Sequence, residues 1–158
     1  MRRAFSPLLF ALCLLLCACA GNEPESVGLP NPWSDHASLH EAEKEAGTEL
    51  GLSEELGSFK AEVFRTMSGG LLEVIYRASD DVEIRVRKLA GEEQDISGDY
   101  SNYTQIRKET IDGAKITIKT HDAATLILVS CDGYSWSISA QEGFGNDNAG
   151  VFIDAIIK

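Results

Sequence analysis

The sequence predicts an α+β fold, in which an antiparallel, mostly meandering sheet of about six to seven strands accompanies a short N-terminal helix and a C-terminal helix. Two observations predict it. Apolar and polar residues alternate with a period of two in consecutive runs separated by turn residues, which is typical of strands that bury one face. Segments near both ends of the region 35–158 instead carry helix-capping residues and apolar stripes with the helical period.

The first three strands are predicted at 59–67, 72–77 and 82–87. A three-residue turn at 79–81 keeps their apolar residues on one face, because a slip of one residue would invert every side chain. That register places Glu73 opposite Arg87 and Arg77 opposite Glu83. We interpret both as opposite-charge pairs on a solvated face of the sheet.

Phe64 and Ile75 interrupt the pattern, because they are apolar where their neighbours are charged. A turn at Gly69-Gly70 would set these two residues opposite each other. Either a helix covers them or they form a small exposed patch. We favour a covering helix, since the terminal helices need a surface against which to pack.

The segment 91–103 is polar and irregular, and it is the longest candidate functional loop. Its oxygen atoms are suitable calcium ligands, but their spacing does not fit an EF-hand loop, and we favour a solvated acidic loop. Further strands are predicted at 103–111, 114–119, 125–129 and 134–139. The run 125–129 is apolar on both faces, which is typical of a central, covered strand.

The last predicted strand is aromatic on one face and flat on the other. Tyr134, Trp136 and Ile138 share one face, and the intervening residues are all serines. A serine face is a poor packing surface, but it allows another backbone or a helix to approach closely. We expect the aromatic face to build the core, with Leu126 and Leu128 packing opposite; the alternative is that it lines a groove.

A short helix is predicted over 39–46. Ser38 and Glu41 have capping-box spacing, and Gly47 suits the C-terminal stop. Residues 53–57 resemble a single helical turn between two caps.

A C-terminal helix is predicted to run through Ile157. Asn146 or Asp147 can cap its N-terminus through a side-chain oxygen. Its apolar stripe consists of Ala149, Phe152, Ile153 and Ile156.

The N-terminus has the organisation of a secretory signal. Arg2 and Arg3 precede an apolar run, 7–16, that is too short to anchor the chain stably. The stretch Leu16-Cys17-Ala18-Cys19 then resembles the lipobox of bacterial lipoproteins. In that family the signal peptidase cuts before the lipobox cysteine, which carries a thioether-linked diacylglycerol. Cys19 fits this role better than Cys17 because it follows a small residue; the alternative is an ordinary secretory signal that contains cysteines.

These features divide the chain into a lipoprotein signal peptide at 1–18, a lipidated Cys19 with a flexible tether at 19–34, and a single α+β domain at 35–158. The prolines, glycines and asparagines of the tether oppose regular structure. Trp33 near its end is expected to dock on the domain, although an exposed contact is the alternative.

Cleavage makes the chain more acidic. Loss of Arg2 and Arg3 lowers the Lys and Arg count from 14 to 12 against 25 Asp and Glu, a formal charge of −13. Such a surface disfavours nucleic acid and is repelled by anionic headgroups, so the lipid must supply attachment to the outer face of the cell membrane. Cys131 is the one cysteine left unmodified, which excludes an intramolecular disulfide.

Four strand and loop motifs carry a second resemblance: Leu71-Leu72-Glu73-Val74-Ile75-Tyr76-Arg77, Glu83-Ile84-Arg85-Val86-Arg87-Lys88, Asp95-Ile96-Ser97-Gly98-Asp99-Tyr100 and Gly133-Tyr134-Ser135-Trp136-Ser137-Ile138-Ser139. Together they resemble an uncharacterised extracytoplasmic domain of unknown function. That domain is found in Gram-positive lipoproteins and on some anti-sigma factors. The resemblance covers 31–158. It implies an α+β fold, and it implies no catalytic residues.

No residue pattern predicts a catalytic site, a metal or a cofactor. His36 and His40 share a helix face only if the first helix begins early, and Cys131 and His121 are expected at separate strand ends. The function predicted is therefore a binding or protein-interaction module, with an envelope protein or peptide as its possible partner. Its candidate ligand-binding residues are Tyr76, Tyr134 and Trp136. A cell-envelope enzyme with an unrecognised active site is the alternative.

Overall fold

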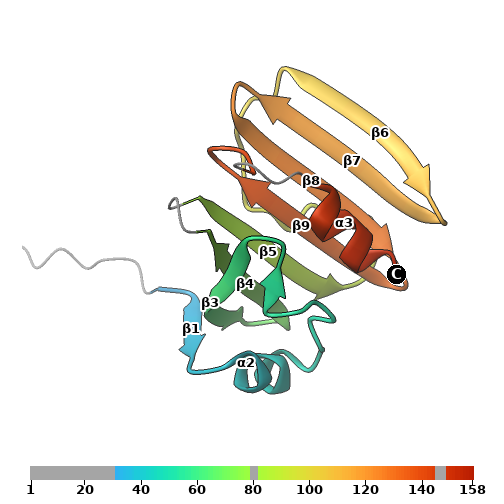
Figure 1. Cartoon of the computed structure of the whole chain (residues 1–158). Coiled ribbons are helices and arrows are strands. Elements are labelled where there is room, and N and C mark those ends of the chain that lie inside the picture. The colour runs from blue at the N-terminus through green and yellow to red at the C-terminus, as the bar shows by residue number, and fades with distance from the viewer. Residues whose placement is uncertain (1–30, 79–81, 145–148) are drawn as a thin grey trace, which may run out of the picture. The chain divides into compact units, whose positions relative to one another are not determined.

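The computed structural model describes residues 31–78, 82–144 and 149–158. Over these residues the chain is an antiparallel sheet with two helices, which is an α+β arrangement (Figure 1). The strands are β1 (Trp33–His36), β2 (Glu55–Leu56), β3 (Phe59–Met67), β4 (Leu71–Arg77), β5 (Glu83–Ala90), β6 (Gln105–Ile111), β7 (Ala114–His121), β8 (Ala124–Cys131) and β9 (Tyr134–Ala140). The helices are α2 (Leu39–Ala46) and α3 (Gly150–Ile156).

Within the described residues the sheet has nine strands rather than the six or seven predicted. The two additional strands, β1 and β2, both pair with β3. They are only four and two residues long, so neither shows a clear alternation in the sequence. The expected helical turn at 53–57 is wrong, because Glu55 and Leu56 pair with Lys60 and Phe59 as a short strand.

The strand order is β1-β3-β4-β5-β9-β8-β7-β6, so two meanders meet where β5 pairs with β9. Strand β6 follows β5 in sequence but lies at the far edge of the sheet (Figure 1). The chain must therefore cross three strands between β5 and β6. The segment 91–104 makes this passage, and we call it the crossing loop.

The register divides the side chains between two faces. The inner face is apolar and includes Val74, Val86, Ile138 and Ile127, which are paired in sequence across β4, β5, β9 and β8. The outer face carries the alternate residues, among them the three serines of β9. The inner face forms the core with α2 and α3.

Phe152 of α3 shows how the core is closed. Its ring lies 5.5 Å from Phe59, 5.4 Å from Tyr76 and 6.0 Å from Phe144, measured between ring centroids. Edge-on and tilted contacts at these distances are favourable for aromatic rings. The caps expected at 146 and 147 lie outside the described residues, and the described helix begins at Gly150.

Helix α2 has the predicted bounds. The Ser38 hydroxyl accepts a hydrogen bond from the Glu41 backbone N–H at 3.3 Å, and the Glu41 carboxylate accepts one from the Ala37 N–H at 3.1 Å. Gly47 ends the helix in the left-handed conformation, with φ of 70°. Ala42 is fully buried against the sheet.

The predicted cross-strand charge pairs are confirmed: Glu73 pairs with Arg87, and Arg77 pairs with Glu83. The turn at 79–81 lies outside the described residues. The solvated face is wrong for Glu73, whose side chain is fully buried.

The prediction that Phe64 opposes Ile75 is wrong. Met67 pairs with Leu71 across a three-residue turn at 68–70, so Phe64 pairs with Val74 on the inner face. A register shift between Ala61 and Val63 then places Ala61 on the same face, opposite Tyr76. Ile75 pairs with Val63 instead and is buried on the outer face.

The partners expected for the aromatic face of β9 are also wrong. Trp136 pairs with Val129, and Ile138 pairs with Ile127. Leu126 and Leu128 lie opposite serines on the outer face. The run in β8 is apolar on both faces, so its sequence did not indicate which alternate set faces the aromatic side.

Candidate functional site

The crossing loop is held against the outer face by the serines of β9 and β8. The Ser135 hydroxyl donates to the Gly91 carbonyl at 2.7 Å and accepts from the Gln94 N–H at 3.0 Å. The Ser130 hydroxyl accepts from the Glu93 N–H at 3.2 Å. The flat serine face thus allows a covering backbone to approach closely, as its sequence predicted, and that backbone belongs to this loop.

Arg87 anchors the next part of the loop. Its Nη1 donates to the carbonyl of Ile96 at 3.1 Å and to that of Ser97. The same nitrogen would lie 2.8 Å from a Cβ at Gly98, where φ is 63°. Both the backbone conformation and the space therefore favour glycine at position 98.

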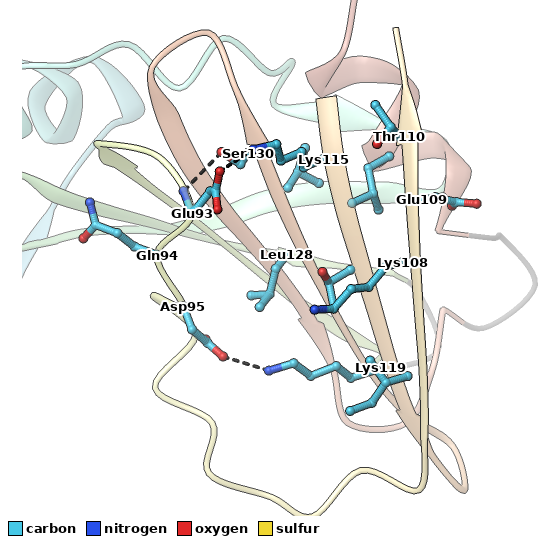
Figure 2. A pocket seen from close by; sticks show the side chains of 14 residues that line it. Glu93, Gln94, Asp95, Lys108, Glu109, Thr110, Lys115, Lys119, Leu128 and Ser130 are labelled. Carbon is cyan, nitrogen blue, oxygen red and sulfur yellow. Dashed lines mark hydrogen bonds and ion pairs between the residues drawn. The ribbon is translucent and has the colours of Figure 1, made fainter. Parts of the chain in front are cut away.

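A groove of about 670 Å³ lies between the crossing loop and strand β6 (Figure 2). Thr117 of β7 and Leu128 of β8 are cross-strand partners on its floor. Ile106 and Lys108 of β6 line the opposite wall, and the Ile106 residue is 61% exposed. The groove thus combines apolar, hydroxyl and charged groups on an open surface.

Two ion pairs cross this groove. Lys115 pairs with Glu93, and the Lys119 ammonium lies 2.9 Å from the Asp95 carboxylate (Figure 2). The hydrogen bond from Lys115 lowers the pKa of Glu93, and the same contact raises the pKa of Lys115. Lys108 has no hydrogen-bonding or ionic partner among the residues that the structure describes. The groove therefore presents one unpaired ammonium beside two paired ones.

Hydrogen bonds also organise the groove's acidic rim. Partial burial would raise the pKa of Asp95, but hydrogen bonds from Lys119 and Ser97 outweigh it and lower that pKa. Further along, hydrogen bonds from Ser101 and Tyr103 lower the pKa of Asp99 to about 2. These carboxylates are ionised at neutral pH, and they stabilise the loop by accepting hydrogen bonds from its own residues.

The sequence-predicted binding residues do not line this groove. Tyr76 is fully buried on the inner face, where its hydroxyl donates to the Ser53 carbonyl at 2.9 Å and its ring contacts Phe152. Burial raises its pKa well above the usual value. Tyr76 is thus part of the core under α3.

Tyr134 and Trp136 are brought together, but around a lysine. The Lys88 ammonium lies 4.2 Å from the Tyr134 ring centroid and 4.5 Å from that of Trp136. It also donates to the Glu49 carbonyl at 2.7 Å, and burial lowers its pKa. Trp136 is only 5% exposed, so the favoured core position agrees with the structure. Tyr76 pairs with Ile84, four residues along β5 from Lys88, so the three aromatics form no common site.

A buried charge cluster on the outer face was not predicted from the sequence. The Glu73 carboxylate accepts from Arg65 Nε at 2.5 Å and from Arg87 Nε at 2.6 Å. Trp33 lies against the same two guanidinium groups, at 5.0 Å and 5.1 Å from its ring centroid. Trp33 therefore docks on the domain, as expected, and belongs to β1 rather than to the tether.

The remaining chemically reactive residues are dispersed. His36 Nε2 lies 2.9 Å from the Thr66 hydroxyl. Cys131 and His121 lie at opposite ends of the β7–β8 pair, and burial raises the pKa of the Cys131 thiol. Within residues 31–78, 82–144 and 149–158, no three His, Cys, Asp or Glu side chains are placed to hold a metal ion.

Comparison with known proteins identifies no family for this chain. No protein-family model, curated protein or solved structure matches it. None of the helices in the described part of the chain has the length and apolar character needed to cross a membrane.

Proposed function

We propose that this chain is a lipoprotein, anchored through Cys19 to the outer face of the cell membrane, whose domain binds an envelope protein or peptide. The lipobox-like stretch Leu16-Cys17-Ala18-Cys19 supports the anchor, and the net acidic charge supports attachment by lipid rather than by basic residues. The strand motifs that resemble the extracytoplasmic domain of unknown function support the same location.

The groove on the outer face is the observation that carries the binding proposal. Its floor of Thr117 and Leu128 and its wall at Ile106 offer apolar surface, and its lysines and carboxylates offer charged groups for orientation. Binding sites commonly combine these two kinds of surface.

The pairing of charges in the groove favours binding over the enzymatic alternative. Glu93 and Asp95 are each held by a lysine, and the pKa values of both carboxyl groups are lowered. A general acid at neutral pH needs a raised carboxyl pKa instead. Lys108, which is unpaired among the described residues, would attract an acidic side chain of the partner.

Filling the groove tests this proposal. The wild-type lipidated chain is cross-linked in membranes, purified, and its captured proteins identified, alongside Thr117→Trp. The bulky side chain on the groove floor should abolish capture of the proteins retained by the wild type. Glu45→Trp, on the exposed side of α2, is the matched control and should capture them normally.

Two further controls keep this result interpretable. Equal melting temperatures of the two tryptophan variants show that loss of capture is not loss of folding. Cys19→Ala should lose partners that require membrane placement. Capture of the same proteins by wild type and Thr117→Trp would overturn the groove as the binding surface.

A further inference from the structure

Strand β6 is an open edge of the sheet. All seven of its residues pair with β7 without a register shift, and no strand in the described part of the chain pairs with its other side. It contains no proline and no bulge, which are two of the means of blocking such an edge; its charged residues, Arg107, Lys108 and Glu109, are a third, and they permit pairing only with a strand of complementary charge. Its outward N–H and C=O groups are thus arranged to pair with another strand.

The charges of β6 have no complement on β7. Arg107 pairs across the ladder with Ile118, and Glu109 pairs with Ile116. Arg107 and Glu109 contact each other along the strand at 3.4 Å, and the Arg107 side chain is 69% exposed. Both side chains lie on the inner-face side, and the side of the strand away from β7 is open to a second partner.

We propose that β6 pairs antiparallel with β6 of a second copy of this chain, about a two-fold axis at Lys108. This register places Arg107 opposite Glu109 of the second copy, and Glu109 opposite Arg107 of the second copy. Ile106 then lies opposite Thr110, and Gln105 lies opposite Ile111. The strand is therefore complementary to itself on the inner-face side, while Lys108 meets its own counterpart on the outer-face side.

The symmetry selects this register over its neighbours. A two-fold axis perpendicular to the sheet pairs residues that share a face, so the axis must pass beside one residue of β6. An axis at Arg107 would oppose two arginines, and one at Glu109 would oppose two glutamates. An axis at Lys108 gives two attractive pairs, and its one like-charged pair lies over the open groove.

The arrangement closes on itself. Because each copy uses its single β6 edge, the paired edges are consumed and the assembly stops at two copies. The outer faces of both copies lie on the same side of the joined sheet. Their grooves therefore adjoin at the two Lys108 side chains.

Charge reversal provides the first test, on the full chain in detergent micelles by analytical ultracentrifugation. Arg107→Glu and Glu109→Arg should each weaken self-association by about tenfold or more, because each turns two attractive pairs into repulsive ones. The double variant Arg107→Glu/Glu109→Arg should associate like the wild type. An equimolar mixture of the two single variants should form mixed dimers, since each then supplies the charges that the other lacks.

Several results would overturn the proposal. They are a wild type that stays monomeric at all concentrations, single variants that associate as well as the wild type, or a mixture that fails to pair. If the β6 edge binds a different protein instead, the wild type should stay monomeric. The measurement follows association rather than location, so it succeeds or fails independently of lipid anchoring and of the groove.

Cross-linking tests the register. In a Cys131→Ser background, Lys108→Cys should form a disulfide between copies under mild oxidation. Thr110→Cys is the matched control, because its counterpart in the second copy lies four residues along the strand, roughly 13 Å away, and should not cross-link. Equal cross-linking at both positions, or none at position 108, would contradict an axis at Lys108.

Discussion

Glu73 is a carboxylate that the fold removes from water and surrounds with arginines. Its side chain is fully buried, and Arg65 and Arg87 donate to different oxygens. A buried ion of this kind costs desolvation energy, which its partners offset only while all of them are present. The contribution of the cluster is therefore seen when one member is removed.

We predict that Glu73→Ala lowers the free energy of unfolding by about 3–5 kcal/mol, because it leaves two guanidinium groups without their buried counter-ion. Chemical denaturation of the purified chain measures this. The control is Glu62→Ala. The Glu62 side chain is 48% exposed, and its carboxylate lies 3.1 Å from the Arg77 guanidinium. That change should cost roughly 0–1 kcal/mol. Equal losses for the two variants would show that burial does not set the contribution of Glu73.

The sequence indicated the pairing partner of Glu73 but not its burial. Alternation and turn length were sufficient to place it opposite Arg87, because register depends on local pattern. Arg65 reaches the cluster because β3 pairs with β4, and Trp33 reaches it from β1, which pairs with the other side of β3. That adjacency is a property of the sheet, and no local pattern around Glu73 contains it.

At the scale of elements, β9 is the strand that connects the two halves of the sheet. It lies between β5 and β8 and joins the two meanders. Its aromatic side supports the inner core around Lys88, and its serine side receives the crossing loop. Each face thus has a different structural role.

We predict that Trp136→Ala lowers the free energy of unfolding by roughly 3–5 kcal/mol, because it opens a cavity in the core and removes a ring beside the Lys88 ammonium. Thermal or denaturant unfolding measures the loss. Glu45→Trp serves as a surface control and should unfold like the wild type. A Trp136→Ala variant as stable as the wild type would contradict the core position of this side chain.

Elements with strong local signals were predicted well, and those without them were not. Helix α2 was located from its capping box, and the longer strands from their alternation. Strands β1 and β2 depend on pairing with β3 rather than on their own residues. The irregularity between Ala61 and Val63 was missed for the same reason, and the three-residue turn at 68–70 placed Phe64 opposite Val74.

At the scale of the molecule, the path from β5 to β6 creates the candidate site. Because β6 lies at the far edge, the loop that reaches it must cross the outer face, and the groove forms between this loop and the edge strand. The loop was predicted from the sequence as the longest candidate functional loop. The groove was not predicted, because it depends on a strand order that connects distant segments.

The groove, the open β6 edge and the lipobox-like stretch at the N-terminus are consistent with the proposal that the protein acts at a membrane surface. Confinement by a lipid raises the local concentration of a weakly pairing domain, which favours both self-association and partner capture. Both proposals about the domain therefore depend for their physiological setting on the proposed anchor, and modification at Cys19 is the central claim.

Mass spectrometry of the mature N-terminus, on protein extracted from the membranes of the expressing cell, tests this claim most directly. We predict a chain that begins at Cys19 and carries the additional mass of a diacylglycerol on that residue. Cys17→Ala should carry the same modification, whereas Cys19→Ala should lack it. A mature chain that begins elsewhere, or that begins at an unmodified Cys19, would contradict the account.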